Sequence, residues 1–238
     1  MPDTAGMTSL GRHYRALVLG SSGGIGRAFV EHLRSDPACA EVIGLSRSGD
    51  GFDVTEDESV AAAAAKFAEA ERRFELVIVA TGALVIDGNG PEKTIKAIQA
   101  DVMAAQFALN AIGPALAIKH FAPLLSNEGK SVFAVLSARV GSIGDNRLGG
   151  WISYRSSKAA LNQIMRTSAI EISRLRPKSV VVSLHPGSVD TGFSGGFSKG
   201  HDRVSTGESV GNLLSVLDRL EPAQTGGFFA YDGQPVEW

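Results

Sequence analysis

Short, continuous apolar runs alternate with longer helical stretches along this 238-residue chain, and this alternation constrains the fold more than any other feature. The runs contain few polar positions, which is typical of parallel strands covered by helices on both faces. Alternation of such strands with helices predicts βαβ units and a doubly wound, mainly parallel α/β sheet. The expected strands span residues 15–19, 41–45, 75–80, 131–137, 180–185 and 227–231, with a shorter one at 52–54.

Helical periodicity fills the intervals between the expected strands. Pro177 ends one helix, and Gly113 with Pro114 interrupts another, which predicts either a kinked helix or one that begins near Asn110. No linker-like composition divides the chain, so we expect one domain over residues 15–238 after a loose polar tail over residues 1–14. The expected helices span residues 24–34, 57–72, about 94–125, 154–175 and 206–220.

Charge balance and cysteine content exclude several classes of function. Lys and Arg total 23 against 25 Asp and Glu, so neither nucleic acid nor an anionic membrane surface is an expected partner. Cys39 is the only cysteine, which excludes an intrachain disulfide and favours a reducing cytoplasm. No apolar run approaches the roughly 18 residues of a membrane span. The five histidines lack metal-ligand spacing, so we expect no metal.

Residues 16–28 read Ala-Leu-Val-Leu-Gly-Ser-Ser-Gly-Gly-Ile-Gly-Arg-Ala and join an expected strand to an expected helix through a glycine-rich turn. Gly20 would allow the tight turn, Gly24 the approach of the backbone to a pyrophosphate, and Gly26 close helix packing. The N–H groups at the start of the helix would face the anion. This pattern predicts a Rossmann-type dinucleotide site, to which Ser22 and Ile25 of the same turn would also contribute.

Tyr154 and Lys158 are four residues apart in an expected helix, so the phenol and the ammonium share one face, one turn apart. An adjacent cation favours the tyrosinate and would lower the pKa of the phenol from about 10, so that it exchanges a proton near neutral pH. The alternative is a chance pair on a solvated helix face. The order of the other motifs decides between these two interpretations.

That order resembles the short-chain dehydrogenase/reductase family over nearly the whole chain. Its members carry Thr-Gly-x-x-x-Gly-x-Gly after the first strand, matched here at residues 19–26 with Leu19 in place of threonine. Asn110 matches the family's active-site asparagine, and residues 137–146 and 231–238 are most similar to C-factor-type, or sniffer-like, carbonyl reductases. The family's Pro-Gly turn, which holds the nicotinamide amide, is matched at residues 185–191, with expected cofactor contacts from Pro186, Gly187, Val189 and Thr191.

The resemblance implies hydride transfer between a nicotinamide cofactor and a small carbonyl or alcohol substrate. Tyr154 would protonate the carbonyl oxygen, Lys158 would lower the pKa of the tyrosine and hold the ribose hydroxyls, and Asn110 would position a water for proton relay. Tyr154 and Lys158 are therefore expected to contact the cofactor as well. The resemblance leaves open dehydration or epimerisation by the same tyrosine, a dinucleotide-binding regulator with little turnover, and assembly as a homodimer or homotetramer.

Two positions depart from the family pattern. Residues 79–82 read Val-Ala-Thr-Gly instead of Asn-Asn-Ala-Gly, so the amides that brace the sheet are absent, while Gly82 stays beside the adenosine. Ala138 stands where the family has its catalytic serine. We favour Ser137 as the hydroxyl that orients the substrate carbonyl, and Ser142 is the alternative.

The end of the second expected strand bears on the choice of cofactor. Ser46 and Arg47 stand where an acidic residue would bind the 2′-hydroxyl of NAD. A guanidinium suits a 2′-phosphate, so NADP(H) is favoured over NAD(H), unless Arg47 is simply a solvated side chain at the strand end. Asp53 and Val54 resemble the family's Asp-Val pair at the adenine edge, with Asp53 as acceptor. Asp53 could equally cap the following helix.

Three features flank the expected site. His185 precedes the Pro-Gly turn, and we expect a strand-end histidine held by a backbone carbonyl rather than a group that faces the nicotinamide pocket. Trp151 lies just before the tyrosine. Residues 192–200, rich in Gly, Ser and Phe, predict either a lid that closes over substrate or a disordered connection.

Overall fold

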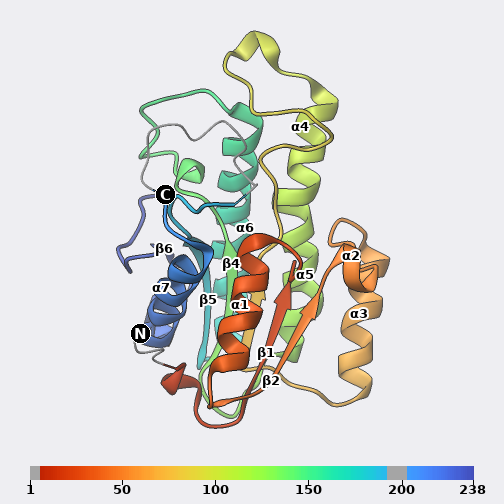
Figure 1. Cartoon of the computed structure of the whole chain (residues 1–238), viewed down its shortest axis with the longest axis vertical. Coiled ribbons are helices and arrows are strands. Elements are labelled where there is room, and N and C mark those ends of the chain that lie inside the picture. Colours follow the sequence, from red (N-terminus) through yellow and green to blue (C-terminus); the bar gives the residue numbers. More distant parts are fainter. Residues whose placement is uncertain (1–5, 192–202) are drawn as a thin grey trace.

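The computed structural model of the chain, which describes residues 6–191 and 203–238, is a parallel sheet between two layers of helices (Figure 1). The six strands of this sheet follow the order β2-β1-β3-β4-β5-β6, and every neighbouring pair is parallel. The expected doubly wound α/β fold is therefore confirmed. The strands are β1 (Tyr14–Leu19), β2 (Cys39–Leu45), β3 (Leu76–Val79), β4 (Ser131–Leu136), β5 (Ser179–His185) and β6 (Phe228–Ala230).

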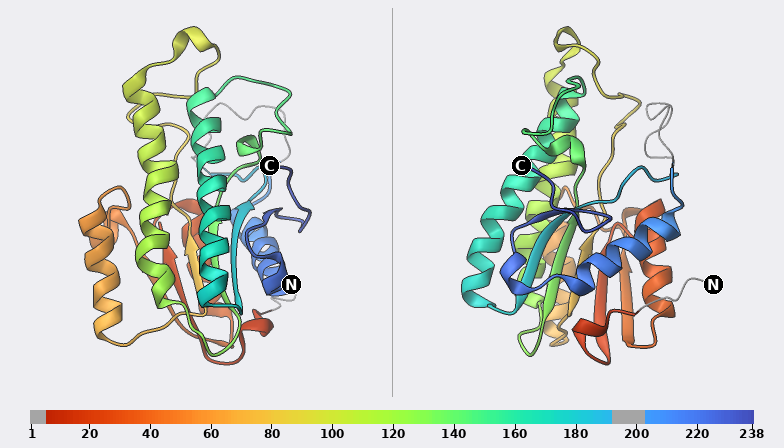
Figure 2. Two further views of the ribbon diagram at one scale, coloured as in Figure 1. Left: turned by 180° about the vertical axis from the view of Figure 1, so that it is seen from behind. Right: turned by 90° about the vertical axis from the view of Figure 1, so that its left-hand side faces the viewer.

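Helices cover both faces of the sheet (Figures 1 and 2), and the strands supply side chains to the core on each face. Ala16 and Val18 of β1 pack beneath α1 and α7, whereas Leu17 and Leu19 pack beneath α3, α5 and α6. Because successive side chains point to opposite faces, each strand must be apolar throughout. The helices are α1 (Gly24–Ser35), α2 (Arg47–Asp50), α3 (Asp57–Glu69), α4 (Ala100–Phe107), α5 (Gly113–Phe121), α6 (Ile152–Leu175) and α7 (Thr206–Arg219).

Helices α4 and α5 join through a π-helical turn at Ala108–Ile112, and the resulting helical segment lies beside α6 (Figure 2). The helix expected over residues 94–125 thus begins at Ala100 and carries its irregularity at the turn that contains Asn110. Pro114 lies in the first turn of α5, where a missing backbone N–H is tolerated. The segment Ala100–Leu124 has the length and apolar composition of a membrane span, which a core helix shares, and its Phe121 is fully buried in the core.

Residues 52–54 do not form the expected strand. A short helix, α2, follows β2 instead, and its first N–H groups are capped by Ser46, whose Oγ accepts a hydrogen bond from Gly49 N–H at 3.1 Å. Phe52 and Val54 are buried in the core beneath α3 and α5. Their apolar character therefore reflects loop packing rather than sheet pairing.

Residues 7–14 also differ from the expected loose tail. Met7 is buried, and its N–H donates a hydrogen bond to Asp36 Oδ2 at 2.8 Å. A 3₁₀ turn at Thr8–Leu10 follows, and Ser9 N–H bonds to Asp218 Oδ1 of α7 at 2.8 Å. This segment is polar in composition but packs because its few apolar side chains are buried and its backbone N–H groups find carboxylates. Residues 1–5 lie outside the described residues.

Candidate active site

A cavity of about 650 Å³ opens at the carboxyl ends of β1, β3, β4 and β5. This edge includes the point where the strand order reverses between β1 and β3, which is where doubly wound sheets bind ligands. The expected site residues that line the cavity are Gly24, Ile25, Gly26, Gly82, Ser137, Tyr154, Lys158, Pro186, Gly187, Val189 and Thr191. Those that lie outside its lining are Gly20, Ser22, Arg47, Asp53, Val54 and Asn110.

The glycine-rich turn between β1 and α1 forms one wall of this cavity. Gly20 has a φ of 87°, and its N–H donates to Leu45 O at 2.8 Å, which ties the turn to the end of β2. A Cβ on Gly26 would lie 2.1 Å from Gly20 O, and one on Gly24 would lie 2.9 Å from Thr191 Cγ2. Neither position therefore has room for a side chain, and residues 23–26 at the amino-terminal end of α1 line the cavity. These residues fit the pyrophosphate of a dinucleotide.

Tyr154 and Lys158 project from the first turns of α6, and both side chains are buried. Lys158 Nζ lies 6.0 Å from the centre of the Tyr154 ring and donates a hydrogen bond to Leu136 O at 2.9 Å. Burial raises the pKa of the Tyr154 phenol and lowers the pKa of the Lys158 ammonium to about 7. The expectation that Lys158 lowers the pKa of Tyr154 is therefore wrong for this structure, because burial dominates. The phenol is protonated at neutral pH.

Asn110, in the π-helical turn, braces the loop after β3. Its Oδ1 accepts a hydrogen bond from Ala83 N–H at 3.0 Å, and its Nδ2 donates to Ala83 O at 2.9 Å and to Gln106 Oε1 at 2.6 Å. Gln106 Nε2 in turn donates to Leu84 O at 3.0 Å. The amide expected to position a water is thus committed to the loop beside Gly82. Sequence reasoning missed Gln106, although its spacing of four residues from Asn110 was an available signal.

In both candidate serines, the hydroxyl that was expected to orient the substrate carbonyl is hydrogen-bonded within the protein. Ser137 lines the cavity, but its Oγ donates a hydrogen bond to Oδ1 of the buried Asn162 of α6 at 2.7 Å. Ser142 Oγ accepts from Asp145 N–H at 3.0 Å, and Ser142 does not line the cavity. Since a hydroxyl has one proton to donate, Ser137 cannot orient a carbonyl oxygen while it is bonded to Asn162. Here the structure differs from the sequence prediction.

His185 lies at the end of β5 and lines the cavity, which the sequence analysis did not favour. Its Nδ1 accepts a hydrogen bond from Arg139 N–H at 3.3 Å instead of donating to a backbone carbonyl. Burial, assisted by the Arg139 guanidinium, lowers the pKa of His185 to about 4. The imidazole is therefore neutral at physiological pH.

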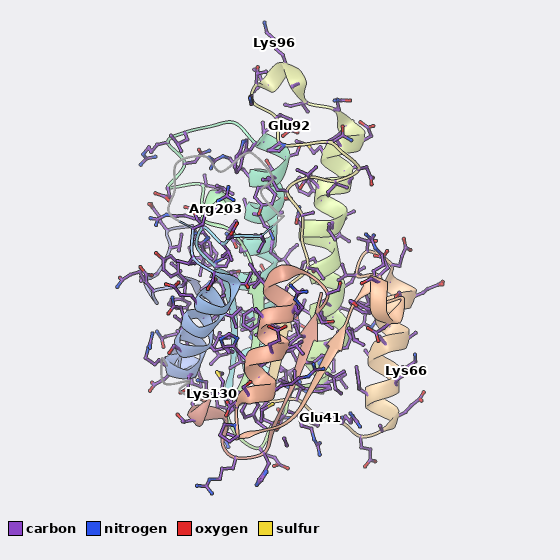
Figure 3. All side chains as sticks on the ribbon, viewed as in Figure 1. Glu41, Lys66, Glu92, Lys96, Lys130 and Arg203 are labelled. Carbon is purple, nitrogen blue, oxygen red and sulfur yellow. The ribbon has the colours of Figure 1, made fainter. Side chains whose placement is uncertain are left out.

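Glu92, on the loop before α4, caps the helix that carries the tyrosine (Figure 3). Its buried carboxylate accepts hydrogen bonds from Ser153 N–H, at 3.2 Å, and from Ser153 Oγ. The residue at the N-cap position, Trp151, has a φ of 54° and contributes no side-chain cap. A carboxylate at this end also complements the helix dipole. No local pattern marks Glu92, because its partner lies 61 residues further along the chain.

The residues expected at the adenine edge lie at the end of β2 and in the loop that follows. Arg47 has a side chain that is 82% exposed, and its guanidinium is 3.8 Å from Asp53 Oδ2. Asp53 Oδ1 accepts hydrogen bonds from Thr55 N–H, at 3.0 Å, and Thr55 Oγ1, at 2.7 Å, which lower the pKa of Asp53. Asp53 therefore stabilises a turn and is not the N-cap of α3, which is Glu56. Val54 packs against Gly113 of α5.

Trp151 lines the cavity, whereas the segment expected as a lid, residues 192–200, lies outside the described residues. Within residues 6–191 and 203–238, no three His, Cys, Asp or Glu side chains form a group that could hold a metal ion.

Comparison with known proteins agrees with this fold. The family model described as Enoyl-(Acyl carrier protein) reductase matches residues 39–234. The 1-hydroxy-2-glutathionyl-2-methyl-3-butene dehydrogenase of Rhodococcus sp. is 34% identical over 188 residues, 79% of each chain. C-signal of Myxococcus xanthus is 37% identical over 137 residues, 57% of this chain and 78% of that protein. The NADPH-bound carbonyl reductase from chicken fatty liver has a TM-score of 0.81 and 29% identity, with 95% of both chains covered.

The fold and the cavity thus define a Rossmann-type oxidoreductase with a site for a nicotinamide cofactor. The chain belongs to the short-chain dehydrogenase/reductase family, as its motifs predicted. The expected likeness to C-factor-type carbonyl reductases is confirmed as well.

Proposed function

We propose that the protein is an NADP(H)-dependent oxidoreductase that transfers hydride between the nicotinamide and a carbonyl or alcohol substrate. The observation that carries this proposal is the buried Tyr154–Lys158 pair in the same cavity as the glycine-rich turn. The likeness to an NADPH-bound carbonyl reductase supports the choice of a carbonyl substrate. The nicotinamide, when bound, supplies the hydride.

Tyr154 is the proton donor in this mechanism. Because burial raises its pKa, the phenol carries the proton that a carbonyl oxygen needs as negative charge develops on it. Lys158 Nζ, held by Leu136 O beside the ring, stabilises the tyrosinate that this transfer produces. In the opposite direction, the tyrosinate takes the proton from an alcohol.

Arg47 supports the preference for NADP(H). Its guanidinium stands at the end of β2, is largely exposed, and is held only loosely by Asp53 at 3.8 Å. A 2′-phosphate would bind this guanidinium through charge-assisted hydrogen bonds, which a 2′-hydroxyl cannot match.

Replacement of the phenol tests the proposal. We expect Tyr154→Phe to lower kcat for a panel of ketones and aldehydes by about 100-fold or more, because the proton donor is lost. The affinity for NADPH, followed by nicotinamide fluorescence, should change little. Tyr14→Phe is the matched control, since it removes a buried hydroxyl that bonds to Asp36 away from the cavity. Unchanged turnover in Tyr154→Phe would contradict the proposal.

A second candidate function is a dinucleotide-binding signalling protein with little turnover. Ala138 at the family's serine position and the likeness to C-signal favour it. The same experiment separates the two, because this alternative predicts NADPH binding without turnover of any carbonyl by the wild-type protein.

A further inference from the structure

Among the described residues of the cavity lining, neither the family's serine position nor its neighbour Ser137 offers a hydroxyl to share the substrate carbonyl with Tyr154. Ala138 has no polar side-chain atom, and Ser137 Oγ is bonded to Asn162 Oδ1 at 2.7 Å. A carbonyl oxygen that gains negative charge is stabilised best by more than one donor. A donor beside Ala138 would supply the missing hydrogen bond.

His185 lies beside that position. Strands β4 and β5 are paired, and Ser137 N–H donates to Leu184 O at 2.7 Å, so the end of β5 lies next to the end of β4. The hydrogen bond from Arg139 N–H to His185 Nδ1, at 3.3 Å, places the imidazole against the peptide that follows Ala138. Residues 138, 139, 154 and 185 all line the one cavity.

The same hydrogen bond fixes the tautomer of the ring. Since Nδ1 accepts from a backbone N–H, the proton of the neutral imidazole must be on Nε2, which is then a donor. The charged groups that influence the ring are Arg139, which lowers its pKa together with burial, the larger cause, and Asp232, whose opposing effect is smaller than either. A neutral imidazole donor polarises a carbonyl without giving up its own proton.

We propose that His185 Nε2–H donates a hydrogen bond to the substrate carbonyl oxygen, as the second donor beside Tyr154, in place of the serine absent at position 138. His185 is then a catalytic residue that orients the carbonyl and stabilises its developing charge. No proton leaves the imidazole, because Tyr154 supplies the proton and the cofactor the hydride. This inference rests on the proposed carbonyl chemistry.

Four variants test this role: His185→Ala, His185→Gln, Ala138→Ser and the double variant His185→Ala/Ala138→Ser. We expect His185→Ala to lower kcat/KM for a ketone by about 100-fold, the effect of removing one such donor. His185→Gln retains an amide donor and should recover about tenfold of that loss. The double variant should recover at least about tenfold by supplying the family's hydroxyl, whereas Ala138→Ser alone should change kcat/KM by less than about threefold.

Measurements on the same variants separate a catalytic role from a packing role. If the role of His185 is catalytic, NADPH affinity and melting temperature should not rank the four variants in the order in which kcat/KM ranks them. His32→Gln on α1, a histidine outside the cavity lining, is the matched control. If His185→Ala keeps its kcat/KM, or if Ala138→Ser fails to rescue it, the inference is overturned while the proposed function stands. If the wild-type protein binds NADPH but reduces no carbonyl, the proposed function fails and the inference falls with it.

Discussion

At the residue scale, burial sets the protonation of the two side chains at the centre of the site. Lys158 and Tyr154 are each held in their neutral forms more strongly than in water, because the cavity wall removes solvent from both. A spacing of four residues shows that a phenol and an ammonium share a helix face. It does not show whether attraction between them or desolvation decides their pKa values.

The effect of burial on the pKa of Lys158 predicts how the free energy of unfolding depends on pH in the absence of cofactor. The pKa of Lys158 is about 7 in the folded protein and 10.5 for the ordinary side chain, so between these values only the unfolded state holds the proton. The free energy of unfolding should therefore rise with pH over this window, by at most about 1.4 kcal/mol per pH unit. Urea denaturation at pH 7 and pH 9 measures the rise. The raised pKa of Tyr154 acts only from about pH 10 upward, where it lowers the free energy of unfolding as pH rises, and so does not affect the comparison of pH 7 with pH 9.

Lys158→Met should flatten that rise, because it removes the titrating group. Lys66→Met, on the exposed side of α3, serves as the control and should keep it. An equal slope in Lys158→Met and the wild-type protein would show that another group is responsible.

At the scale of elements, the start of α6 depends on a residue from a different part of the chain. Trp151 precedes the helix in a left-handed conformation, and Glu92 supplies the acceptor for Ser153 N–H. Tyr154 follows immediately. The position of Tyr154, the proposed proton donor, is thus tied to the loop before α4, in the same way that Asn110 ties the loop after β3 to the π-helical turn.

Glu92→Ala should weaken this end of the helix, because it leaves two buried donors of Ser153 without their acceptor. We expect a loss of about 1–3 kcal/mol in the free energy of unfolding, and a decrease in kcat with little change in the KM for NADPH. Glu92→Gln retains an acceptor oxygen and should recover most of the kcat. Glu58→Ala, on the exposed surface of α3, is the control. Equal kcat in Glu92→Ala and the wild-type protein would show that the cap formed by Glu92 does not affect catalysis.

At the scale of the whole molecule, short apolar runs separated by helical stretches predicted the six strands and the helical layers, but also a strand at residues 52–54 that does not form. The glycine-rich turn and the Tyr154–Lys158 spacing likewise predicted residues that the fold brings to one cavity. Contacts between distant residues could not be predicted in this way. The Ser137–Asn162 bond spans 25 residues and the Glu92–Ser153 contact spans 61, and neither leaves a local pattern. The packing of Met7 was missed for the same reason.

The cavity proposed to bind the dinucleotide is lined by residues that follow several different strands of the sheet. Binding of the ligand should therefore stabilise the fold as a whole. A ligand that binds only the folded state adds RT ln(1 + [L]/Kd), about 2.7 kcal/mol at a concentration 100 times Kd. We expect NADPH to raise Tm more than NADH at equal concentration. Arg47→Asp should abolish this difference by repelling the 2′-phosphate, with a loss of tenfold or more in NADPH affinity. Arg34→Asp, at the opposite end of α1 from the glycine-rich turn, should leave the increases in Tm caused by NADPH and by NADH unchanged. A preference for NADPH that survives in Arg47→Asp would place the 2′-phosphate on other residues.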